Sequence, residues 1–557
     1  METKCDVLVV GAGLAGLTAA RELHKKAPHL KVVVLEAKDR VGGRTLTVNL
    51  KTANGTDQWD LGGQWVGSTQ IHLLNLLKEL NIEYYTQYVT GKKLSQIGGT
   101  KIRPYSTTLP TAQELRDYSI WEGVDFLMAL SRLESMAAKL NPNDVFALPE
   151  AARWDGMTLD EWARQNCHTR TMVDSLNLAA KCAMGTESKR LNLLFMLYYG
   201  RSAGTISDLL EAEGMGAQRY RIKGGSQQLS RMMSDDLGDI VHLQTAVTKI
   251  EETAGGLRVL TTSTDGSDKQ TVFRCMRIIL AVPPSEAGKV NFIPPLPYHK
   301  RQLFDGAPQG NLIKFVFTYE TAFWREKGYS GEILSTGYTE IPGEILPLCL
   351  TYDAVTSHGS AALLGFVHNE QWADRSKEER KIALLKDLAR FFGDQCYTYI
   401  DYEDKNWHTE PYNGGCPVSC LPAGNMEYFM RIREPVDRIH FAGTESATLW
   451  PGYMSGAVQS GLRAAHEVLW NLHPKTVDRK LLEGSVYEQD YHQPQGPVGL
   501  SYQSSSSSLA IGKRLLLVSG VAAGLYALSK RYELPFITRV TQHLEEAVYS
   551  LYERFHR

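Results

Sequence analysis

The sequence contains few of the residue patterns that indicate a disulfide scaffold or a metal centre. It has 8 cysteines among 557 residues, and they form no CxxC pair. Histidines do not cluster at the spacing that zinc sites use, so we expect no metal site. Scattered cysteines in apolar surroundings are typical of a reduced, cytosol-facing protein rather than of a secreted one.

The chain also lacks a strong net charge. Its 60 Lys and Arg residues almost balance its 62 Asp and Glu residues, which leaves a formal net charge of −2. This balance gives no general attraction to nucleic acid, which we exclude as a partner. No signal peptide is expected, because no basic region with an apolar stretch precedes the first predicted strand. A chain of this length with 43% hydrophobic residues is typical of a globular enzyme with two or more domains.

Glycine is concentrated in a G-x-G-x-x-G turn near the start of the chain. The turn consists of Gly11, Gly13 and Gly16. It lies between an apolar, β-branched run at Val7–Val10 and a predicted helix at Thr18–Lys26. A second predicted strand, Val32–Leu35, ends on Glu36. In a nucleotide-binding βαβ unit such glycines let a pyrophosphate approach the helix N-terminus, and the acid binds a ribose. We therefore predict a dinucleotide site here.

A further glycine pair with two arginines follows the acid. Its key residues are Arg40, Gly43 and Arg44. The two guanidinium groups would lie near the same pyrophosphate. This arrangement resembles the FAD-binding signature of the flavin amine oxidase superfamily rather than that of a nicotinamide dehydrogenase.

Helical and strand patterns alternate along the rest of the chain. Apolar residues at helical spacing predict helices at Ile71–Leu80, Glu122–Lys139, Leu159–Gln165 and Leu191–Tyr199. Apolar or alternating runs predict strands at Val241–Glu251, Ile278–Val282 and Asn311–Phe317. Lys314 lies in the middle of the last strand. It must either extend outward to solvent or point at a buried polar partner, and the pattern leaves both open.

The most specific motifs lie in the last third of the chain. A predicted strand at Ile439–Ala442 leads into a turn from which Glu445 would bind a ribityl hydroxyl. Gly452–Ala457 would begin a helix whose N-terminus points at a flavin. Five segments of the chain, this region among them, resemble an animal flavin monoamine oxidase. They are Arg40–Thr45, Asp60–Gly67, Ala307–Trp324, Asn406–Gly424 and Pro435–Ala457.

The resemblance implies an α/β fold with a Rossmann-like FAD-binding domain of the p-hydroxybenzoate hydroxylase (GR2) type. We expect this domain to be discontinuous and to consist of residues 1–83, 210–290 and 395–470. An α+β substrate-binding domain is expected from residues 84–209 and 291–394. An extension and flexible linker at residues 471–508 would follow.

The resemblance also assigns catalytic and substrate-binding roles. Lys314 would hold a water molecule against flavin N5, and Trp407 would pack against the flavin. Tyr453 would flank the substrate amine in front of the ring. Gln218 and Leu350 complete the expected substrate-binding set with Tyr453.

The cofactor implied by the resemblance is FAD, held through residues from several segments. Cys416 matches the cysteine whose sulfur bonds the flavin 8α-methyl group, and an ordinary loop cysteine is the alternative. The expected cofactor-binding residues are Gly11, Gly13, Gly16, Glu36, Arg40, Gly43, Arg44, Gly63, Gln64, Trp65, Val247, Cys416, Gly443, Glu445 and Met454.

The implied reaction is oxidative deamination of primary amines, and of some secondary and tertiary amines, such as biogenic amines. The products are aldehyde, ammonia and hydrogen peroxide, with O2 reoxidising the flavin. The resemblance also implies a homodimer.

The chain departs from the family pattern beside the expected flavin-linked cysteine. A tyrosine should follow Cys416, where this chain has Pro417, and Leu350 stands at another aromatic position of the cavity. The preferred amine is therefore open, and a polyamine or L-amino-acid oxidase of the same fold is the alternative. An amino-acid substrate would need an arginine aimed into the cavity, and the sequence identifies none. A flavin-binding protein with little turnover is a third hypothesis, against which the retained catalytic residues argue.

The C-terminal part of the chain has the pattern of a membrane anchor. The apolar run Leu515–Leu528 spans about 21 Å as a helix, against a hydrocarbon core of about 30 Å. Counted over residues 509–531, with Lys513 and Arg514 extended to the interface, it would cross. The segment resembles a tail anchor of the mitochondrial outer membrane, which places the enzyme on the cytoplasmic face; a soluble packing helix is the alternative. Residues 532–557 are expected to form an amphipathic tail on the membrane surface.

Overall fold

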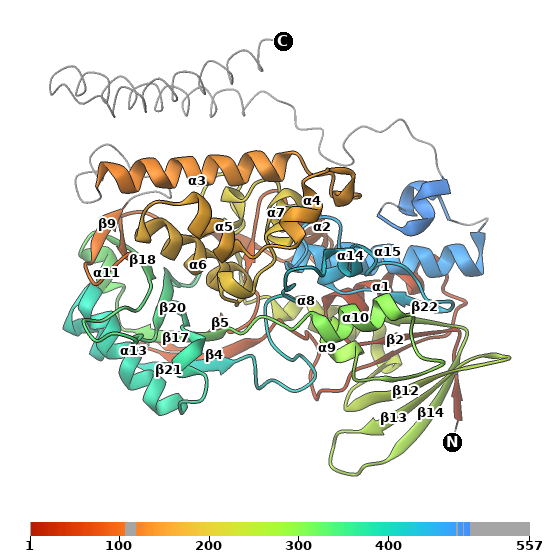
Figure 1. The fold of residues 1–557 in the computed structure, drawn as a ribbon. Helices are drawn as coiled ribbons and strands as arrows, with labels where there is room; N and C mark the ends of the chain where they lie inside the picture. The colour runs from red at the N-terminus through yellow and green to blue at the C-terminus, as the bar shows by residue number, and fades with distance from the viewer. Residues whose placement is uncertain (1, 106–118, 475–476, 483, 491–557) are drawn as a thin grey trace. The chain divides into compact units, whose positions relative to one another are not determined.

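A five-stranded parallel sheet brings together strands from distant parts of the chain. The computed structural model describes residues 2–105, 119–474, 477–482 and 484–490 (Figure 1). The strand order is β11 (Val241–His242), β3 (Val32–Leu35), β2 (Val7–Val10), β15 (Arg277–Leu280) and β22 (Ile439–Phe441). Every residue of β2 and β3 is buried, as expected for a parallel sheet covered on both faces. The predictions of these two strands are confirmed with the same bounds.

Two helices from opposite ends of the described chain pack together beside this sheet. They are α1 (Leu14–Lys26) and α15 (Met454–Leu472), and each also contacts strands of the sheet. A Cβ atom on Gly461 would lie 2.3 Å from the carbonyl oxygen of Ala15, so the two helix backbones are almost in contact. Helices α8 (Gln227–Leu237) and α2 (Ile71–Glu79) pack beside them. The opening and the closing segments therefore share one core.

The single strand predicted at Val241–Glu251 is wrong, because the chain bends within it. Gln244 has a positive φ of 52°, and it separates β11 from β12 (Thr245–Thr253). β11 belongs to the parallel sheet, whereas β12 belongs to a second sheet. The order of that sheet is β1 (Glu2–Lys4), β14 (Gln270–Cys275), β13 (Gly256–Ser263), β12 and β16 (Asn291–Ile293). Alternating hydropathy continues through the bend and does not reveal it.

A seven-stranded sheet forms the second large part of the fold. Its order is β21 (Asp401–Asn406), β17 (Ile313–Tyr319), β20 (Ala361–Val367), β19 (Leu348–Asp353), β18 (Tyr329–Ser335), β8 (Lys92–Gln96) and β9 (Arg103–Tyr105). All seven residues of β17 are buried. Helix α13 (Lys377–Phe392) supplies Leu388 and Phe391 to the core on one face, where they join Phe315 and Phe317. On the other face Leu178 packs with Leu350 and Phe366.

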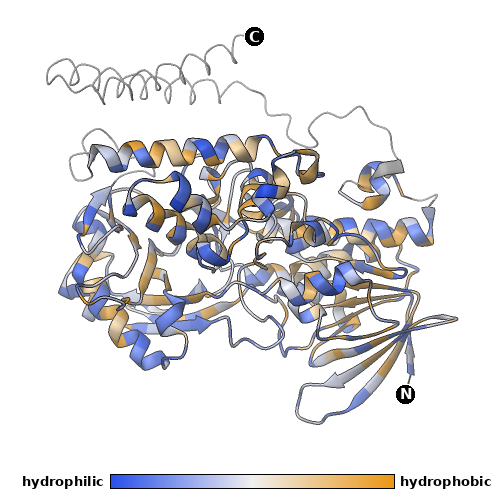
Figure 2. Cartoon of the chain, viewed as in Figure 1, coloured by the Kyte–Doolittle hydropathy of each residue, from blue (hydrophilic) through white to orange (hydrophobic). Residues whose placement is uncertain are grey.

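Helices from the middle of the chain cover that second face (Figure 1). They are α3 (Ile120–Ala138), α5 (Leu159–Asn166), α6 (Arg170–Met184) and α7 (Leu193–Ala203). Capping boxes formed by Ser119 with Glu122 and by Thr158 with Glu161 explain where α3 and α5 begin. Hydrophobic and hydrophilic residues both occur along α3, as Figure 2 shows. The helices predicted in this region are confirmed, with ends that move by up to four residues.

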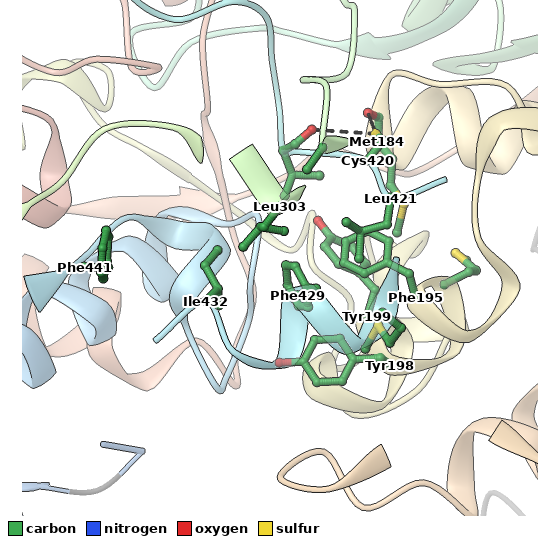
Figure 3. Packing of buried hydrophobic residues seen from close by; sticks show 14 of the residues in the cluster. Met184, Phe195, Tyr198, Tyr199, Leu303, Cys420, Leu421, Phe429, Ile432 and Phe441 are labelled. Atoms are coloured by element: carbon green, nitrogen blue, oxygen red, sulfur yellow. Dashed lines mark hydrogen bonds between the residues drawn. The ribbon is translucent and has the colours of Figure 1, made fainter. Parts of the chain in front are cut away.

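Helix α7 packs against the short helix α14 (Met426–Met430) through aromatic side chains (Figure 3). The rings of Phe195 and Phe429 meet edge to face, with their centroids 5.0 Å apart. The thiol of Cys420 donates a hydrogen bond to the carbonyl oxygen of Met184 at 3.3 Å. Cys420 is therefore a packing residue that ties the segment after Cys416 to α6.

The described chain is thus a mixed α/β protein. Shorter elements complete it: the hairpin of β4 (Thr47–Thr52) and β5 (Gly55–Asp60), and the small sheet of β6 (Trp65–Val66), β10 (Tyr220–Ile222) and β7 (Tyr84–Thr86). The exact domain boundaries stay a prediction. No helix within the described ranges is long and apolar enough to cross a membrane. The predicted anchor at 509–531 and the tail at 532–557 lie outside those ranges.

Candidate active site

One cavity of about 1100 Å³ runs from the glycine-rich turn to the helices above the seven-stranded sheet. Most of the residues predicted from the sequence line it. They are Gly11, Gly13, Glu36, Gly43, Arg44, Gly63, Gln64, Trp65, Gln218, Val247, Lys314, Leu350, Trp407, Cys416, Gly443, Tyr453 and Met454. Three further predicted residues, Gly16, Arg40 and Glu445, do not line it. Segments scattered along the chain therefore meet around one space.

The glycine-rich turn requires glycine at two of its positions. Gly11 has a φ of +100°, and a Cβ atom there would lie 2.9 Å from the carbonyl oxygen of Ala281. A Cβ atom on Gly16 would lie 1.9 Å from the carbonyl oxygen of Gly11, which only a shift of the backbone would relieve. Helix α1 begins after Gly13 without a side-chain cap. Its first N–H groups are therefore available to phosphate oxygens at the cavity wall.

Glu36 is held at the end of β3 by backbone donors. Its carboxylate accepts hydrogen bonds from the N–H groups of Ala12 at 2.7 Å and Lys38 at 3.0 Å. Burial raises the pKa of this carboxyl above its ordinary value, against the effect of those hydrogen bonds. A carboxylate has about four acceptor positions, so two remain for hydroxyl groups in the cavity.

The two arginines of the second glycine motif have different partners. Arg40 donates to the carboxylate of Glu410 at 2.8 Å and to the carbonyl oxygens of Gly43 and Thr45. It therefore braces the loop, and its predicted contact with a pyrophosphate stays a prediction. Arg44 lines the cavity and donates to Glu445 at 2.5 and 3.0 Å.

The ion pair of Arg44 and Glu445 is deeply buried. The Glu445 side chain is only 2% exposed, and it also accepts from the amide of Gln309 at 3.3 Å. Burial alone would raise the pKa of Glu445, but the charge and hydrogen bonds of Arg44 outweigh it and lower the pKa. Arg44 also donates to the carbonyl oxygen of Pro417 at 2.7 Å. The pair thus connects the first glycine-rich region with the loop that carries Cys416.

Lys314 points into the protein, which decides between the two possibilities that the sequence left open. Its ammonium donates to the carbonyl oxygen of Gly62 at 2.8 Å and to the side chain of Gln64 at 2.9 Å. It also lies 5.1 Å from the ring centroid of Trp65. Burial lowers the pKa of Lys314 to about 7. Near neutral pH this residue is therefore poised between its charged and neutral forms.

Trp407 and Cys416 belong to the same wall. The indole N–H of Trp407 donates to the carbonyl oxygen of Leu61 at 2.8 Å, which fixes its ring. Cys416 is a free thiol, and its backbone N–H donates to the carbonyl oxygen of Gly310 at 2.8 Å. Burial raises the pKa of the thiol to about 11, although Arg44 and Lys314 act to lower it.

Tyr199 is a cavity residue that the sequence pattern did not single out. Its ring centroid lies 5.9 Å from that of Tyr453, with an angle of 33° between the ring planes. Trp450 packs edge to face on Tyr453, with centroids 4.9 Å apart. Burial raises the pKa of both tyrosines, so their hydroxyls stay protonated. Tyr199 lies within an apolar helical run, where nothing distinguishes a cavity-facing aromatic from a core one.

Gln218 carries a buried polar atom that the described residues leave without a partner. Its side-chain N–H donates to the carbonyl oxygen of Leu209 at 3.0 Å, while its Oε1 atom has no hydrogen bond within the described ranges. A buried unpaired acceptor on a cavity wall suits a ligand N–H or O–H donor. Leu350 contributes an apolar surface on the neighbouring sheet.

These features fit a flavin dinucleotide. Two uncapped helix starts, those of α1 and α15, supply N–H donors, and Glu36 supplies acceptors. The cavity continues past Trp65, Trp407 and Cys416 to the tyrosines. The roles assigned to individual residues stay predictions.

Comparison with known proteins identifies the family. Residues 14–469 match the family described as flavin containing amine oxidoreductase. The chain is 34% identical to amine oxidase [flavin-containing] B of Canis lupus familiaris, over 93% of this chain and 100% of that protein. It is 33% identical to the probable flavin-containing monoamine oxidase A of Dictyostelium discoideum, over 84% of this chain and 98% of that protein.

Solved structures show the same fold. Cyclohexylamine oxidase from Brevibacterium oxydans IH-35A superposes with a TM-score of 0.75 at 28% identity, over 84% of this chain and 99% of that chain. Wild-type putrescine oxidase bound to putrescine superposes with a TM-score of 0.73 at 29% identity, over 84% and 100%. The predicted family is confirmed, and so is the mixed α/β flavin amine oxidase fold, whereas the C-terminal anchor and the domain division stay predictions. The chain belongs to the flavin containing amine oxidoreductase family and is an FAD-dependent amine oxidase.

Proposed function

We propose that this chain deaminates small amines oxidatively, producing aldehyde, ammonia and hydrogen peroxide. The substrates would be primary amines, with some secondary and tertiary amines. The observation that carries the proposal is the position of Lys314, a buried lysine on the wall of a cavity that Tyr453 and the nucleotide turn also line. FAD, when bound, supplies the two-electron acceptor.

The protein's own residues would position the amine and exclude water. The rings of Tyr453 and Tyr199 offer an aromatic wall to a neutral amine, and their protonated hydroxyls make them surfaces rather than bases. The free acceptor of Gln218 suits an amine N–H group. Tyr199 would thus supply an aromatic face to a cavity in which Pro417 replaces the expected tyrosine.

The proposal is tested by an amine panel on the purified full-length chain. Benzylamine, phenethylamine, serotonin and tyramine should each be tried for anaerobic bleaching of the flavin and for peroxide release in air. Turnover of spermine or of an amino acid with failure of all four monoamines would contradict the proposal and favour the alternative. Arg44 lines the cavity but is occupied by Glu445, which disfavours an amino-acid carboxylate. Bound flavin that no amine bleaches would instead indicate a protein with little turnover.

We propose further that the flavin is attached through Cys416. In support, Cys416 is a free, cavity-lining thiol whose loop is held by Gly310 and Arg44. After acid precipitation, the flavin of the unmodified chain should stay in the pellet. In a Cys416→Ala variant essentially all of it should move to the supernatant. Cys420→Ala is the matched control, because Cys420 donates to Met184 and does not line the cavity, and it should retain the colour in the pellet. Release of flavin from the unmodified chain would contradict the link.

We also propose that residues 509–531 anchor the enzyme in the mitochondrial outer membrane, facing the cytoplasm, and that the enzyme is a homodimer. The anchor is supported by the apolar run between basic pairs in the sequence. A chain truncated after residue 508 should move from the membrane pellet to the supernatant on carbonate extraction. A full-length chain that appears in the supernatant without detergent would contradict the anchor. Light scattering of the truncated chain tests the dimer.

A further inference from the structure

A row of side chains crosses the seven-stranded sheet from Lys314 to the far strands. Residues paired directly on neighbouring strands present their side chains on the same face. The pairings run stepwise from β17 to β9: Lys314 with Phe366, Phe366 with Leu350, Leu350 with Leu334, Leu334 with Ser95, and Ser95 with Arg103. The first five of these six residues line the cavity. This face of the sheet is therefore a continuous wall that leads away from Lys314.

The chemistry of the wall changes along its length. Its middle is apolar, with Phe366, Leu350 and Leu334. Its far end is polar, because Glu332 lies two residues from Leu334 on the same face of β18, and Glu332 also lines the cavity. Three strand spacings separate β17 from β18, which places Glu332 about 14 Å from the Lys314 strand. A ligand that reaches both ends must be elongated.

Glu332 has room for another donor. One oxygen of its carboxylate accepts from the hydroxyl of Tyr105 at 2.8 Å, and the other lies 3.0 Å from the ammonium of Lys93. A carboxylate offers about four acceptor positions, so two remain. Glu122, the other carboxylate on this part of the wall, differs. It already accepts from Arg103, Thr171 and the backbone N–H of Ser119.

The surroundings of Glu332 favour a cation. Burial would lower the pKa of Lys93, but Glu332 and the more distant Glu211 and Glu213 together raise it. Three carboxylates therefore act at the position of Lys93, against its single positive charge, and their combined field attracts a cation. A ligand ammonium beside Glu332 would be stabilised by that field. A methyl group in the same place would displace water from the polar groups without replacing its hydrogen bonds.

We propose that Glu332 binds the distal ammonium of an elongated diamine, whose other, neutral amino group is oxidised in front of Tyr453. This inference rests on the proposed amine oxidation and adds its substrate class. The apolar middle of the wall contacts the methylene chain, and Glu332 with Tyr105 contacts the charged end. Selectivity for the diamine arises from this contact rather than from the reacting centre.

The test compares octylamine, aminooctanol and diaminooctane as substrates of the full-length enzyme. The unmodified enzyme should show a kcat/KM for diaminooctane about tenfold above that for octylamine, mainly through a lower KM, with aminooctanol between them. In a Glu332→Gln variant this ratio should fall about tenfold. Equal kcat/KM values for the three substrates in the unmodified enzyme would overturn the inference. Absence of turnover with octylamine, benzylamine and the other amines alike would instead overturn the proposed function.

Two further variants test the inference in case Glu332→Gln does not fold. Glu332→Gln leaves the buried ammonium of Lys93 without its partner and risks poor folding. Lys93→Gln keeps the carboxylate and removes its competing cation, so the preference for diaminooctane should rise; an unchanged or lower preference would contradict the inference.

Glu213→Gln is the matched control, because Glu213 is exposed and acts on this region only from a distance. If this control lowers the ratio as much as Glu332→Gln does, a general field and not a contact is responsible, and the inference fails.

Discussion

Replacing Lys314 with methionine is expected to lower kcat by about a hundredfold, with the loss in the reaction with oxygen. Lys314 places a buried ammonium on the cavity wall beside Gln64 and Trp65. A preorganised cation in a site shielded from water stabilises negative charge that develops during reaction, and losing one such group costs about 10²–10³ in rate. Methionine retains the length of the side chain but removes its charge and its donors.

Stopped-flow kinetics separate the two half-reactions of this variant. Reduction by an amine without oxygen should change less than reoxidation by oxygen. Because burial lowers the pKa of Lys314 to about 7, the protonated fraction falls as the pH rises through that value. The rate of reoxidation should therefore decrease above about pH 7 in the unmodified enzyme, and this dependence should be absent in Lys314→Met.

A second buried lysine provides a matched control for this prediction. Burial also lowers the pKa of Lys300 to about 7, yet its ammonium donates to the carbonyl oxygens of Arg431 and Ile432, away from the cavity. Lys300→Met should lower thermal stability but leave both half-reactions near their original rates. If Lys314→Met is reoxidised as fast as the unmodified enzyme, the role given to Lys314 is wrong.

Replacing Glu445 with glutamine is expected to lower the free energy of unfolding by about 3–5 kcal/mol and to weaken flavin retention. The substitution leaves the guanidinium of Arg44 buried without its countercharge, and an uncompensated buried charge costs about this much. Arg44 also holds the carbonyl oxygen of Pro417, so the loop of Cys416 should loosen with it. Thermal denaturation and flavin content measured after dialysis check the two effects.

The pH dependence of stability gives an independent check on Glu445. Its pKa lies below the ordinary value of 4.5 in the folded protein, because Arg44 outweighs the effect of burial. A carboxyl with a lowered pKa contributes stability above its unfolded pKa and loses it as the pH falls through the folded pKa. The unmodified protein should therefore lose this contribution below about pH 4.5, and Glu445→Gln should lack it.

The ion pair of Arg380 and Asp404 is the control for a purely structural effect. It is also buried, with contacts of 2.8 and 2.9 Å, but it joins α13 to β21 outside the cavity wall. Asp404→Asn should lower stability by a similar amount while the flavin content stays the same. If Asp404→Asn and Glu445→Gln release flavin equally, the link between Glu445 and the cofactor loop is not supported.

Local sequence patterns were sufficient to predict the opening βαβ unit. Apolar β-branched runs, three glycines and Glu36 are each interpretable within a short window, because strand, turn and helix preferences act between near neighbours. The predicted strands β2 and β3 kept their bounds, and Glu36 lies on the cavity wall. The helix α1 began earlier than predicted, because Leu14–Leu17 already has helical backbone geometry after the turn.

Patterns were less informative where the chain changes direction or forms distant contacts. The bend at Gln244 divided one predicted strand between two sheets. The partner of Arg40 proved to be Glu410, which no local motif would indicate. Tyr199 could not be distinguished from a core residue of its helix, although its ring lies beside that of Tyr453 on the cavity wall.

By itself, therefore, the sequence determined the dinucleotide turn, the family and most of the residues that meet in the cavity. Only the tertiary structure decided that Lys314 points inward, that Arg44 pairs with Glu445, and that Glu332 lines the same cavity as Lys314. The physical reason is the range of the interactions. Backbone preferences and apolar spacing are properties of neighbouring residues, whereas burial, charge pairing and cavity shape arise when distant segments pack together.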